Sequence, residues 1–561
     1  MPTNLFDYFE DAEALPEAGA DARQTASSPW AARPPRRPER DFDLTLFARA
    51  PRWTEDAGSV QALRRIAAEP WVEEIARDGD AVRVRLSDDW IELTGAALEA
   101  GGSAETHLAD LADGKRVSMQ FWDANATKAL HVGHLRNLAI GNALSSALTQ
   151  AGAKVERRSR ISDMGRAMGE AMAGVMQSGR HVQGFFDGDD KSDHFVGECY
   201  ADYVASGGLL DTAVQEQAED SLSREVQVQN DAADGLIKRV LSGDREAVEL
   251  WYRTRAWVIA GQRKTLARLG IAFDRVFFES DYLQETAQLT QEGLDNGTLK
   301  RREDGVVVYS TGFEELEELA LVRSDGLSTQ HMRSLTYCMT APELEDMTSM
   351  QVTGSEWVSH VTSIRKLAQE LRPGLNGGFH PSRSIFHGMV FSQKRAITSS
   401  AGALLIDELA EWIDRQINED EERRRVRAAH PYPERIAAQL ALAYFLPHAA
   451  APDIDFDPAR LLSEESLGWE LARARARHGA GSPNGSRPTE DPDYRFAVVQ
   501  SELYRRHLSL AIERLDVRPL AHYLKHLAIW YLERERSESV ERVVHTLLDR
   551  SARGLGLEAT P

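Results

Sequence analysis

Two histidines flanking a glycine, His131 and His134 in the segment His-Val-Gly-His, are the side chains best placed in this sequence for phosphate chemistry. Residues three apart share one face of the first turn of a helix, and imidazole N–H groups donate hydrogen bonds to phosphate oxygens. A helix N-terminus adds unpaired amides and a partial positive charge, and Gly133 leaves room for a flat purine. The segment predicts a nucleotide site. A capping pair of surface histidines and a His-x-x-His metal site remain as alternatives.

The elements around this segment indicate a βαβ unit. Residues 116–122 have the apolar composition of a strand, residues 131–152 repeat apolar side chains at helical spacing, and residues 154–161 form a second strand candidate. This order favours a parallel, nucleotide-binding sheet. We therefore expect an α/β fold with a Rossmann-type parallel-sheet catalytic domain that carries a helical insertion.

Composition and periodicity divide the rest of the chain. Residues 60–76 and 88–100 have helical spacing, residues 81–86 alternate like a strand, and the chain after residue 410 is almost entirely helical. We expect four parts: a disordered tail (residues 1–44), a reduced N-terminal α+β module (45–114), the catalytic domain (115–410, with the insertion at about 170–265) and an all-α bundle (411–561).

Length and charge narrow the class of protein. A chain of 561 residues needs several hydrophobic cores. It contains no run of 18 apolar residues, so no membrane-spanning helix is expected. The two cysteines, Cys199 and Cys338, exclude a disulfide scaffold and a four-cysteine zinc site. The start of the chain lacks the apolar stretch of a secretory signal, so we expect a cytoplasmic protein. A net charge of −22 excludes a general nucleic-acid binder but allows local basic patches.

The stretch DANATKALHVGHLRN resembles the HIGH segment of class I aminoacyl-tRNA synthetases, and in detail that of the arginyl-tRNA synthetases. Further strings typical of that family follow in the same order: SDMG (162–165), HFVGECY (194–200), FDRVFFESDY (273–282), RSDG (323–326), TGSEW (353–357), HGMVF (387–391) and DIDFDP (453–458). The resemblance covers about residue 80 to the C-terminus. It implies an arginine–tRNA ligase-like enzyme with a helical, anticodon-binding-like C-terminal domain. Such an enzyme activates an amino acid with ATP, accompanied by Mg²⁺, and transfers it to tRNA.

The resemblance also implies a role for individual residues. The catalytic residues would be His131, His134, Lys128, Lys394 and Arg395. The ATP site would use Gly133, Gly354, Glu356, Met389 and Val390. The amino acid would meet Asn125, Glu279, Gln330, Ser334 and Trp357. The tRNA would meet Arg473, Arg475 and Arg477, together with the basic run 423–425. No resident metal ion is expected.

Several of these assignments have plainer alternatives. Ala396 stands where the mobile KMSKS loop of the family has its first lysine, so Lys394 and Arg395, or Lys128, would have to replace it. Glu356 could be a solvated charge, Lys394 and Arg395 an exposed basic pair, and the arginines of the C-terminal region a salt-bridged surface.

The amino-acid pocket departs most from the family. Gln330 and Ser334 stand where the family has a tyrosine and an aspartate, and Trp357 replaces a polar residue, so the pocket loses a negative charge and an aromatic wall. Loss of one charged hydrogen bond typically costs about 1.5–3 kcal/mol. From the resemblance, our first hypothesis is that the protein is a monomer that attaches arginine to tRNA. A paralogue that activates another amino acid or an arginine derivative, and an inactive tRNA- or adenylate-binding regulator, are the alternatives.

Overall fold

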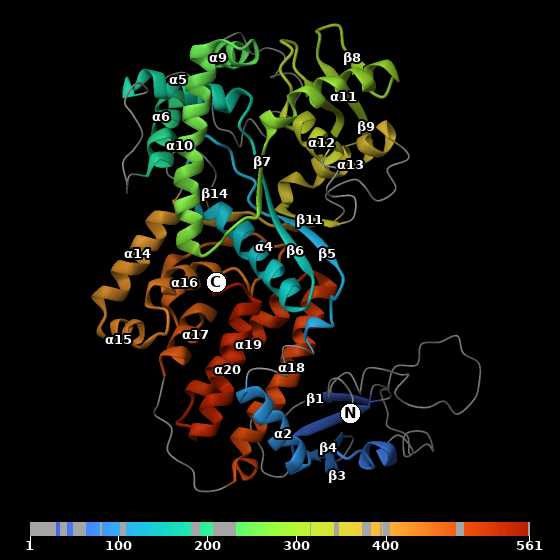
Figure 1. Ribbon diagram of the computed structural model, residues 1–561, viewed down its shortest axis with the longest axis vertical. Helices are drawn as coiled ribbons and strands as arrows, with labels where there is room; N and C mark the ends of the chain where they lie inside the picture. The colour runs from blue at the N-terminus through green and yellow to red at the C-terminus, as the bar shows by residue number, and fades with distance from the viewer. Residues whose placement is uncertain are drawn as a thin grey trace, which may run out of the picture.

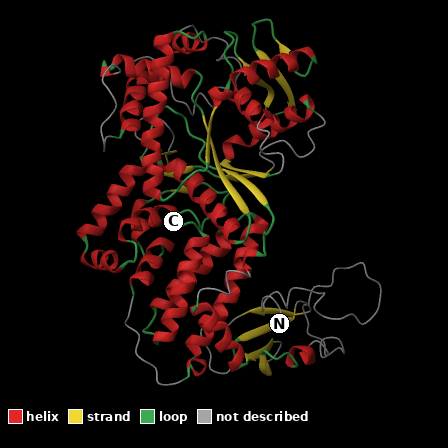
Figure 2. Cartoon of the chain, in the orientation of Figure 1, coloured by secondary structure: helices red, strands yellow, loops and turns green. Residues whose placement is uncertain are grey.

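The computed structural model describes residues 30–33, 42–48, 63–78, 81–100, 108–180, 191–205, 232–314, 316–340, 347–372, 383–392, 395–396, 404–477 and 487–558. A parallel sheet lies at the centre, a helical subdomain and a mixed α/β subdomain lie on one side of it, and a helical bundle lies on the other (Figures 1 and 2). The expected α/β fold with a helical C-terminal region is confirmed. Within these residues, no helix is both long and apolar enough to cross a membrane.

The central sheet has five parallel strands in the order β12-β11-β5-β6-β7. They are β5 (Arg116–Gln120), β6 (Lys154–Ile161), β7 (Arg275–Phe278), β11 (Thr348–Gly354) and β12 (Arg383–His387). The chain first builds the sheet outward from β5 through β6 to β7, and later returns to add β11 and β12 on the other side of β5. The order thus reverses between β5 and β11, and ligands bind at the carboxyl ends of strands beside such a reversal.

Helix α4 (Val132–Gln150) connects β5 to β6 and is almost entirely buried. The predicted strand at residues 154–161 and the helix after His131 are confirmed. The helix is apolar nearly all round because it packs between the sheet and the C-terminal bundle, in contact with α16, α18 and α20 described below.

Helices fill the connection between β6 and β7. They are α5 (Arg166–Gln177), α6 (Ser192–Ala205), α9 (Ala232–Leu241) and α10 (Arg245–Leu269). Helices α5, α6 and α10 share a small apolar core that includes Phe195 and Trp257. This group stands beside the carboxyl ends of the strands (Figure 1).

A second subdomain lies between β7 and β11 and has a core of its own. It contains η4 (Glu279–Tyr282), α11 (Leu283–Asp295), the antiparallel strands β8 (Lys300–Arg301), β9 (Val307–Phe313) and β10 (Leu316–Val322), and α12 (Gln330–Thr340). After β11, η6 (Ser355–Trp357) and α13 (Val358–Leu371) pack onto the same core.

The C-terminal region is helical apart from a small sheet in the order β14-β13-β15. Its strands are β13 (Val390–Ser392), β14 (Arg395–Ala396) and β15 (Ile454–Asp455). Its helices are α14 (Ile406–Glu419), α15 (Glu421–Ala429), η7 (Pro433–Arg435), α16 (Ile436–Ala443), η8 (Pro458–Leu462), α17 (Leu467–Ala476), η9 (Pro488–Glu490), α18 (Pro492–Arg514), α19 (Arg518–Leu532) and α20 (Glu538–Gly554).

The N-terminal module is an antiparallel sheet with one covering helix, packed on the C-terminal bundle (Figure 1). The strands are β1 (Trp30–Arg33), β2 (Leu44–Ala48), β3 (Val72–Asp78) and β4 (Ala81–Leu86), in the order β1-β2-β4-β3, and the helix is α2 (Asp88–Glu99). A buried ion pair joins Arg495 of α18 to Asp43 at 2.6 Å.

Two expectations for this module were wrong. The helix predicted over residues 60–76 covers only residues 63–67 of the described chain, because Pro70 ends it and Val72 and Ile75 pair with β4. Residues 30–33 were predicted to be disordered, but they form β1 and pair with β2. Most of the predicted tail lies outside the described residues.

Candidate active site

The two histidines form a reciprocal cap at the start of α4. The His131 Nδ1 atom accepts a hydrogen bond from the Gly133 amide, and the His134 Nδ1 atom accepts one from the His131 amide, each at 3.1 Å. Their rings lie 3.9 Å apart between centroids. Because both Nδ1 atoms are acceptors, each neutral ring carries its proton on Nε2. The pair therefore presents N–H donors, which suit phosphate oxygens and leave no Nδ1 lone pair for a metal ion.

The amides at this helix start are not available to a ligand, which corrects one part of the prediction. The amide of Val132 donates to the Leu404 carbonyl at 2.9 Å, and that of His134 donates to the His131 carbonyl at 2.9 Å. The two remaining amides, of His131 and Gly133, are bound to the imidazoles. Phosphate binding here would depend on the imidazole N–H groups and nearby cations rather than on free backbone donors.

Both imidazoles are held neutral. Burial, the neighbouring ring and the positive charge of Lys128 place the pKa of His131 well below its usual value. Burial and the Lys128 charge lower the pKa of His134 to about 3. The site therefore enters a reaction at neutral pH with two uncharged donors.

Lys128 stands in the loop that precedes the histidine pair. Its ammonium lies 5.9 Å from the ring centroid of Tyr200 on α6. The buried side chain of Gln262 on α10 holds this loop by donating to the carbonyls of Asn125 (3.2 Å) and Lys128 (2.8 Å). Gln262 was not among the predicted site residues. The sequence could have indicated Gln262, because it is a polar residue on the buried face of a helix.

The segment expected to hold adenine lies after β12. Gly388 comes so close to the backbone of Pro452 that a side chain there would clash, with a Cβ atom only 2.5 Å from the Pro452 carbonyl carbon. The Met389 amide donates to Asp453 at 2.8 Å, and its carbonyl accepts from Ile454 at 2.9 Å. The Met389 amide is therefore not free for a base, whereas its carbonyl can accept a second hydrogen bond. Val390 pairs with β15 in register with Ile454.

Arg136 holds these two segments together. Its guanidinium is buried and donates to the carbonyls of Gly388, Ala449, Ala450 and Pro452 at 2.6 to 3.0 Å. Burial lowers its pKa to about 10. Arg136 was not a predicted site residue, although it lies two positions after His134.

Glu356 lies in η6, immediately after β11. Its carboxylate folds back over Gly354, and desolvation there, together with the charge of Asp453, raises its pKa. Glu356, after β11, and Asp453, just before β15, are therefore close enough for their charges to interact. This placement is compatible with the predicted contact to a ribose, which stays a prediction.

Three strand ends meet at the predicted amino-acid pocket. Asn125, after β5, bridges to Ser162, after β6, and the Ser162 hydroxyl donates to Glu279, after β7, at 2.9 Å. Glu279 is buried and also accepts from the Nε atom of Arg333 at 2.5 Å. The structure thus brings the predicted residues Asn125 and Glu279 together, but pairs Glu279 with an arginine of the protein itself.

The other predicted pocket residues lie on α12 and η6. Gln330 begins α12 and Ser334 lies one turn further along it, and the Ser334 hydroxyl accepts a short hydrogen bond from Nη1 of Arg160, on β6. Trp357 packs against His331, with 6.2 Å between ring centroids, and so lies beside α12. Sequence reasoning missed Arg160 and Arg333. Two arginines near a buried glutamate become visible only when β6, η4 and α12 are brought together.

The loop expected to replace the KMSKS segment is only partly described. Lys394 lies outside the described residues. Arg395 lies in β14, whose backbone pairs with β13. The chain after the loop returns to the histidine pair, where Leu405 bridges to His131 and the Ile406 amide donates to the Leu130 carbonyl at 3.0 Å.

The prediction that Arg475 contacts tRNA is wrong. The same prediction for Arg473 and Arg477 is weakened, because both side chains have partners within the protein. Arg475 is buried, with Asp549 at 2.9 Å and Glu558 as a second ion-pair partner. Arg473 pairs with Glu470 at 3.0 Å, and Arg477 donates to the Tyr531 carbonyl at 2.8 Å. Arg475 and Arg477 thus bind other parts of the C-terminal region, whereas Arg473 pairs within α17.

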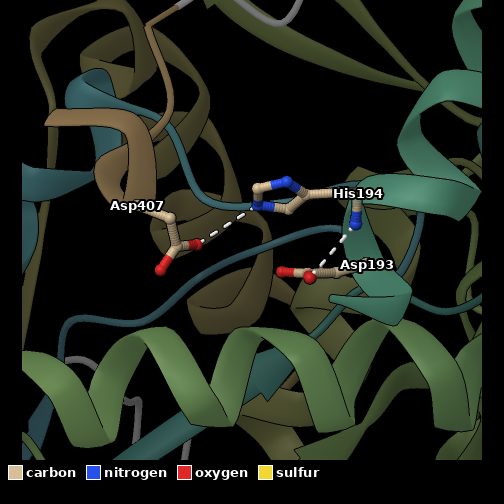
Figure 3. A group of neighbouring side chains, drawn as sticks. All are labelled: Asp193, His194 and Asp407. Carbon is tan, nitrogen blue, oxygen red and sulfur yellow. Dashed lines mark hydrogen bonds and ion pairs between the residues drawn. The ribbon is translucent and has the colours of Figure 1, made fainter. Parts of the chain in front are cut away.

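One group of metal-type ligands occurs among the described residues: Asp193, His194 and Asp407 (Figure 3). His194 lies 3.3 Å from Asp407. The ammonium of Lys191 lies 3.3 Å from Asp193 and 3.1 Å from Asp407, so a cation of the protein already sits between the carboxylates. The group ties α6 to the start of α14 and is best explained as an ion-pair network.

Comparisons with known proteins agree with this geometry. The family model for the catalytic domain of class I (R) tRNA synthetases matches residues 102–443. Arginine–tRNA ligases of Borreliella afzelii and Amoebophilus asiaticus are 27% and 29% identical over 294 and 363 residues. These alignments cover 50% and 61% of this chain and 46% and 59% of the relatives, so the chain spans about half the length of the curated relatives it matches.

Solved structures share the fold. The Thermus thermophilus arginyl-tRNA synthetase superposes with a TM-score of 0.62 at 20% identity, over 98% of this chain and 97% of that one. The Plasmodium falciparum arginyl-tRNA synthetase gives 0.60 at 15% identity, over 95% and 94%. Because the family model covers more than half of the chain, and because its motifs lie at the carboxyl ends of the parallel strands, the protein belongs to the arginyl-tRNA synthetase family of class I tRNA synthetases.

Proposed function

We propose that this protein activates an amino acid with ATP and transfers it to tRNA in the cytoplasm. An oxygen of the amino-acid carboxylate attacks the α-phosphorus of ATP, and the bond to the β-phosphate breaks to release pyrophosphate. A ribose hydroxyl of tRNA then attacks the acyl carbon, and AMP leaves. The observation that carries the proposal is the reciprocal histidine cap at the carboxyl end of β5.

The protein contributes position and charge rather than covalent chemistry. The Nε2–H groups of His131 and His134 donate to phosphate oxygens as negative charge develops on them, and the Lys128 ammonium adds a positive charge beside the pair. Mg²⁺ carried in on the triphosphate would neutralise part of the same charge. Glu356 would hold the ribose, and the segment around Val390, fixed by Arg136, would support the base.

The face of α19 that carries Lys525 between His522 and His526 is a candidate for tRNA contact in place of the arginines predicted on α17. His522 and His526 are exposed beside Lys525, and partial burial with these neighbouring charges lowers the pKa of His522. Phosphate contacts of this kind make binding salt-dependent. We expect Lys525→Glu to weaken tRNA binding and reduce its salt dependence. We expect Lys300→Glu, in β8 at the top of Figure 1 and away from α19, to change neither.

The test of the activity is ATP–pyrophosphate exchange with each amino acid, with and without tRNA. Exchange that depends on an amino acid and is lost in His134→Ala supports activation. Absence of exchange with every amino acid, alongside measurable tRNA binding, would instead support a non-catalytic regulator.

Arginine is the amino acid named for the relatives, and it is the first substrate to test. A second candidate, activation of a different amino acid, is favoured by one observation. The Ser334 hydroxyl and the Glu279 carboxylate are already bound to guanidinium groups of Arg160 and Arg333.

A further inference from the structure

A cluster of charged side chains lies at the carboxyl ends of β5, β6 and β7. Arg160 and Arg333 approach Glu279 from two sides: the Arg333 Nε atom lies 2.5 Å from Glu279 Oε2, and the Arg160 Nη1 atom lies 3.8 Å from Glu279 Oε1. Asp123, after β5, accepts from the side chains of Gln120 (2.7 Å) and Gln351 (3.0 Å). All four charged side chains lie beside the loop that leads to the histidine pair.

The charges of this cluster are balanced before any ligand arrives. Two guanidinium groups face two carboxylates, and burial raises the pKa of Asp123, which disfavours its negative form. Although burial opposes the charge of Arg160, Asp123 and Glu279 raise the pKa of that guanidinium. A cationic side chain entering the pocket would find no net negative charge to pair with, and a buried unpaired charge is costly.

Two groups in the cluster lack full partners. The Arg160 side chain is only 10% exposed, and among the described residues the Ser334 hydroxyl is its one hydrogen-bond acceptor, although a guanidinium has five N–H donors. Glu279 Oε1 is buried and accepts no hydrogen bond from the described side chains. Buried polar atoms without partners at a ligand site are groups that a ligand can satisfy.

We propose that this pocket takes an amino acid whose side chain carries no positive charge and ends in a carbonyl-type oxygen, and that it excludes arginine. The oxygen accepts from the free N–H groups of Arg160. A carboxamide or ureido group fits better than a carboxylate, because its nitrogen can also donate to Glu279 Oε1. The proposal rests on the proposed activation of an amino acid, and it names the class of that substrate.

The test compares L-citrulline with L-arginine, because the two have the same length and shape and differ in the oxygen and the charge. Glutamine, asparagine, glutamate and aspartate complete the panel, in ATP–pyrophosphate exchange with the full chain, with and without tRNA. We expect kcat/KM for at least one oxygen-bearing side chain to exceed that for arginine by tenfold or more, as the loss of a charged hydrogen bond typically gives about tenfold to hundredfold. Arginine as the best substrate overturns the proposal.

Calorimetric titration of the same amino acids separates this proposal from the proposed activity. If no amino acid supports exchange, activation fails as a function, and tighter binding of citrulline or glutamine than of arginine still supports the pocket assignment. Binding of arginine at least as tight as that of every other member of the panel overturns it, whatever the exchange assay shows.

Variants add a direct test of Arg160. Arg160→Leu should weaken the binding of the preferred amino acid by about tenfold to hundredfold. Arg157→Leu is the matched control: it removes the same charge from the same strand, but the Arg157 side chain bonds Ser146 of α4. Equal effects of the two variants on KM for the amino acid would contradict the role given to Arg160. If Arg160→Leu does not fold, the wild-type binding panel decides.

Discussion

Arg136 offers the sharpest test of how α4 positions the nucleotide site. Its buried guanidinium donates to carbonyls of two segments that are more than sixty residues apart, at Gly388 and at Ala449, Ala450 and Pro452. Arg136→Leu places a shorter, apolar side chain in a buried helix and removes every one of these donors. The two segments would then lose their common anchor.

The expected cost follows from the carbonyls left behind. Gly388 and Ala450 keep other partners, because their oxygens also contact the His387 ring and the Gly388 amide. Ala449 and Pro452 lose the one donor they have among the described residues. An orphaned buried acceptor costs about 1–3 kcal/mol, but Ala449 is half-buried and Pro452 is exposed, so water replaces part of the lost donor. Relief of the guanidinium desolvation, which lowers the pKa of Arg136 to about 10, offsets a further part. We expect a net loss of about 1–3 kcal/mol in the free energy of unfolding.

Urea unfolding followed by circular dichroism measures the stability, and the KM for ATP in pyrophosphate exchange measures the site. We expect a KM for ATP raised by about tenfold with a smaller change in kcat, because about 1.4 kcal/mol of lost positioning corresponds to a factor of ten. Arg263→Leu, an exposed arginine on α10, is the control. A variant at Arg136 as stable as this control, with unchanged KM for ATP, would refute the reasoning.

Three further predictions concern single side chains. Lys128→Ala should lower the exchange rate by about tenfold to hundredfold, and an unchanged rate would show that Lys128 does not replace the missing loop lysine. Ser334→Asp alone should not raise kcat/KM for arginine, because the new carboxylate would pair with Arg160. The double variant Ser334→Asp with Arg160→Leu should raise it, and an increase with Ser334→Asp alone would contradict this. The Asp407 hydrogen bond raises the pKa of His194 above 6.5, so its stabilisation is complete below that pH and is lost as the pH rises through the raised value. The difference in unfolding free energy between wild type and His194→Gln should therefore shrink from pH 6 to pH 9, and a constant difference would contradict this.

Local pattern was enough to predict the part of the fold that carries the site. The strand at residues 154–161 and the helix after His131 follow from apolar periodicity and from the turn residues that separate them. Where the pattern was ambiguous, the tertiary structure decided. Residues 72–76 have helical spacing, but β4 offers a strand edge with which Val72 and Ile75 pair, and both side chains lie half-buried there.

The features of the site can likewise be divided into those that the sequence predicted and those that only the structure revealed. The sequence by itself determined that two imidazoles stand at the start of a helix after a parallel strand, because capping and periodicity are local properties. Only the tertiary structure decided that Leu404 closes that helix start, that Arg475 is buried, and that Arg160 reaches Ser334 across 174 residues. The partner of a charged side chain is set by which distant segments the topology brings together. Residue types along the chain therefore indicate that a charge needs a partner, and the fold determines which partner it has.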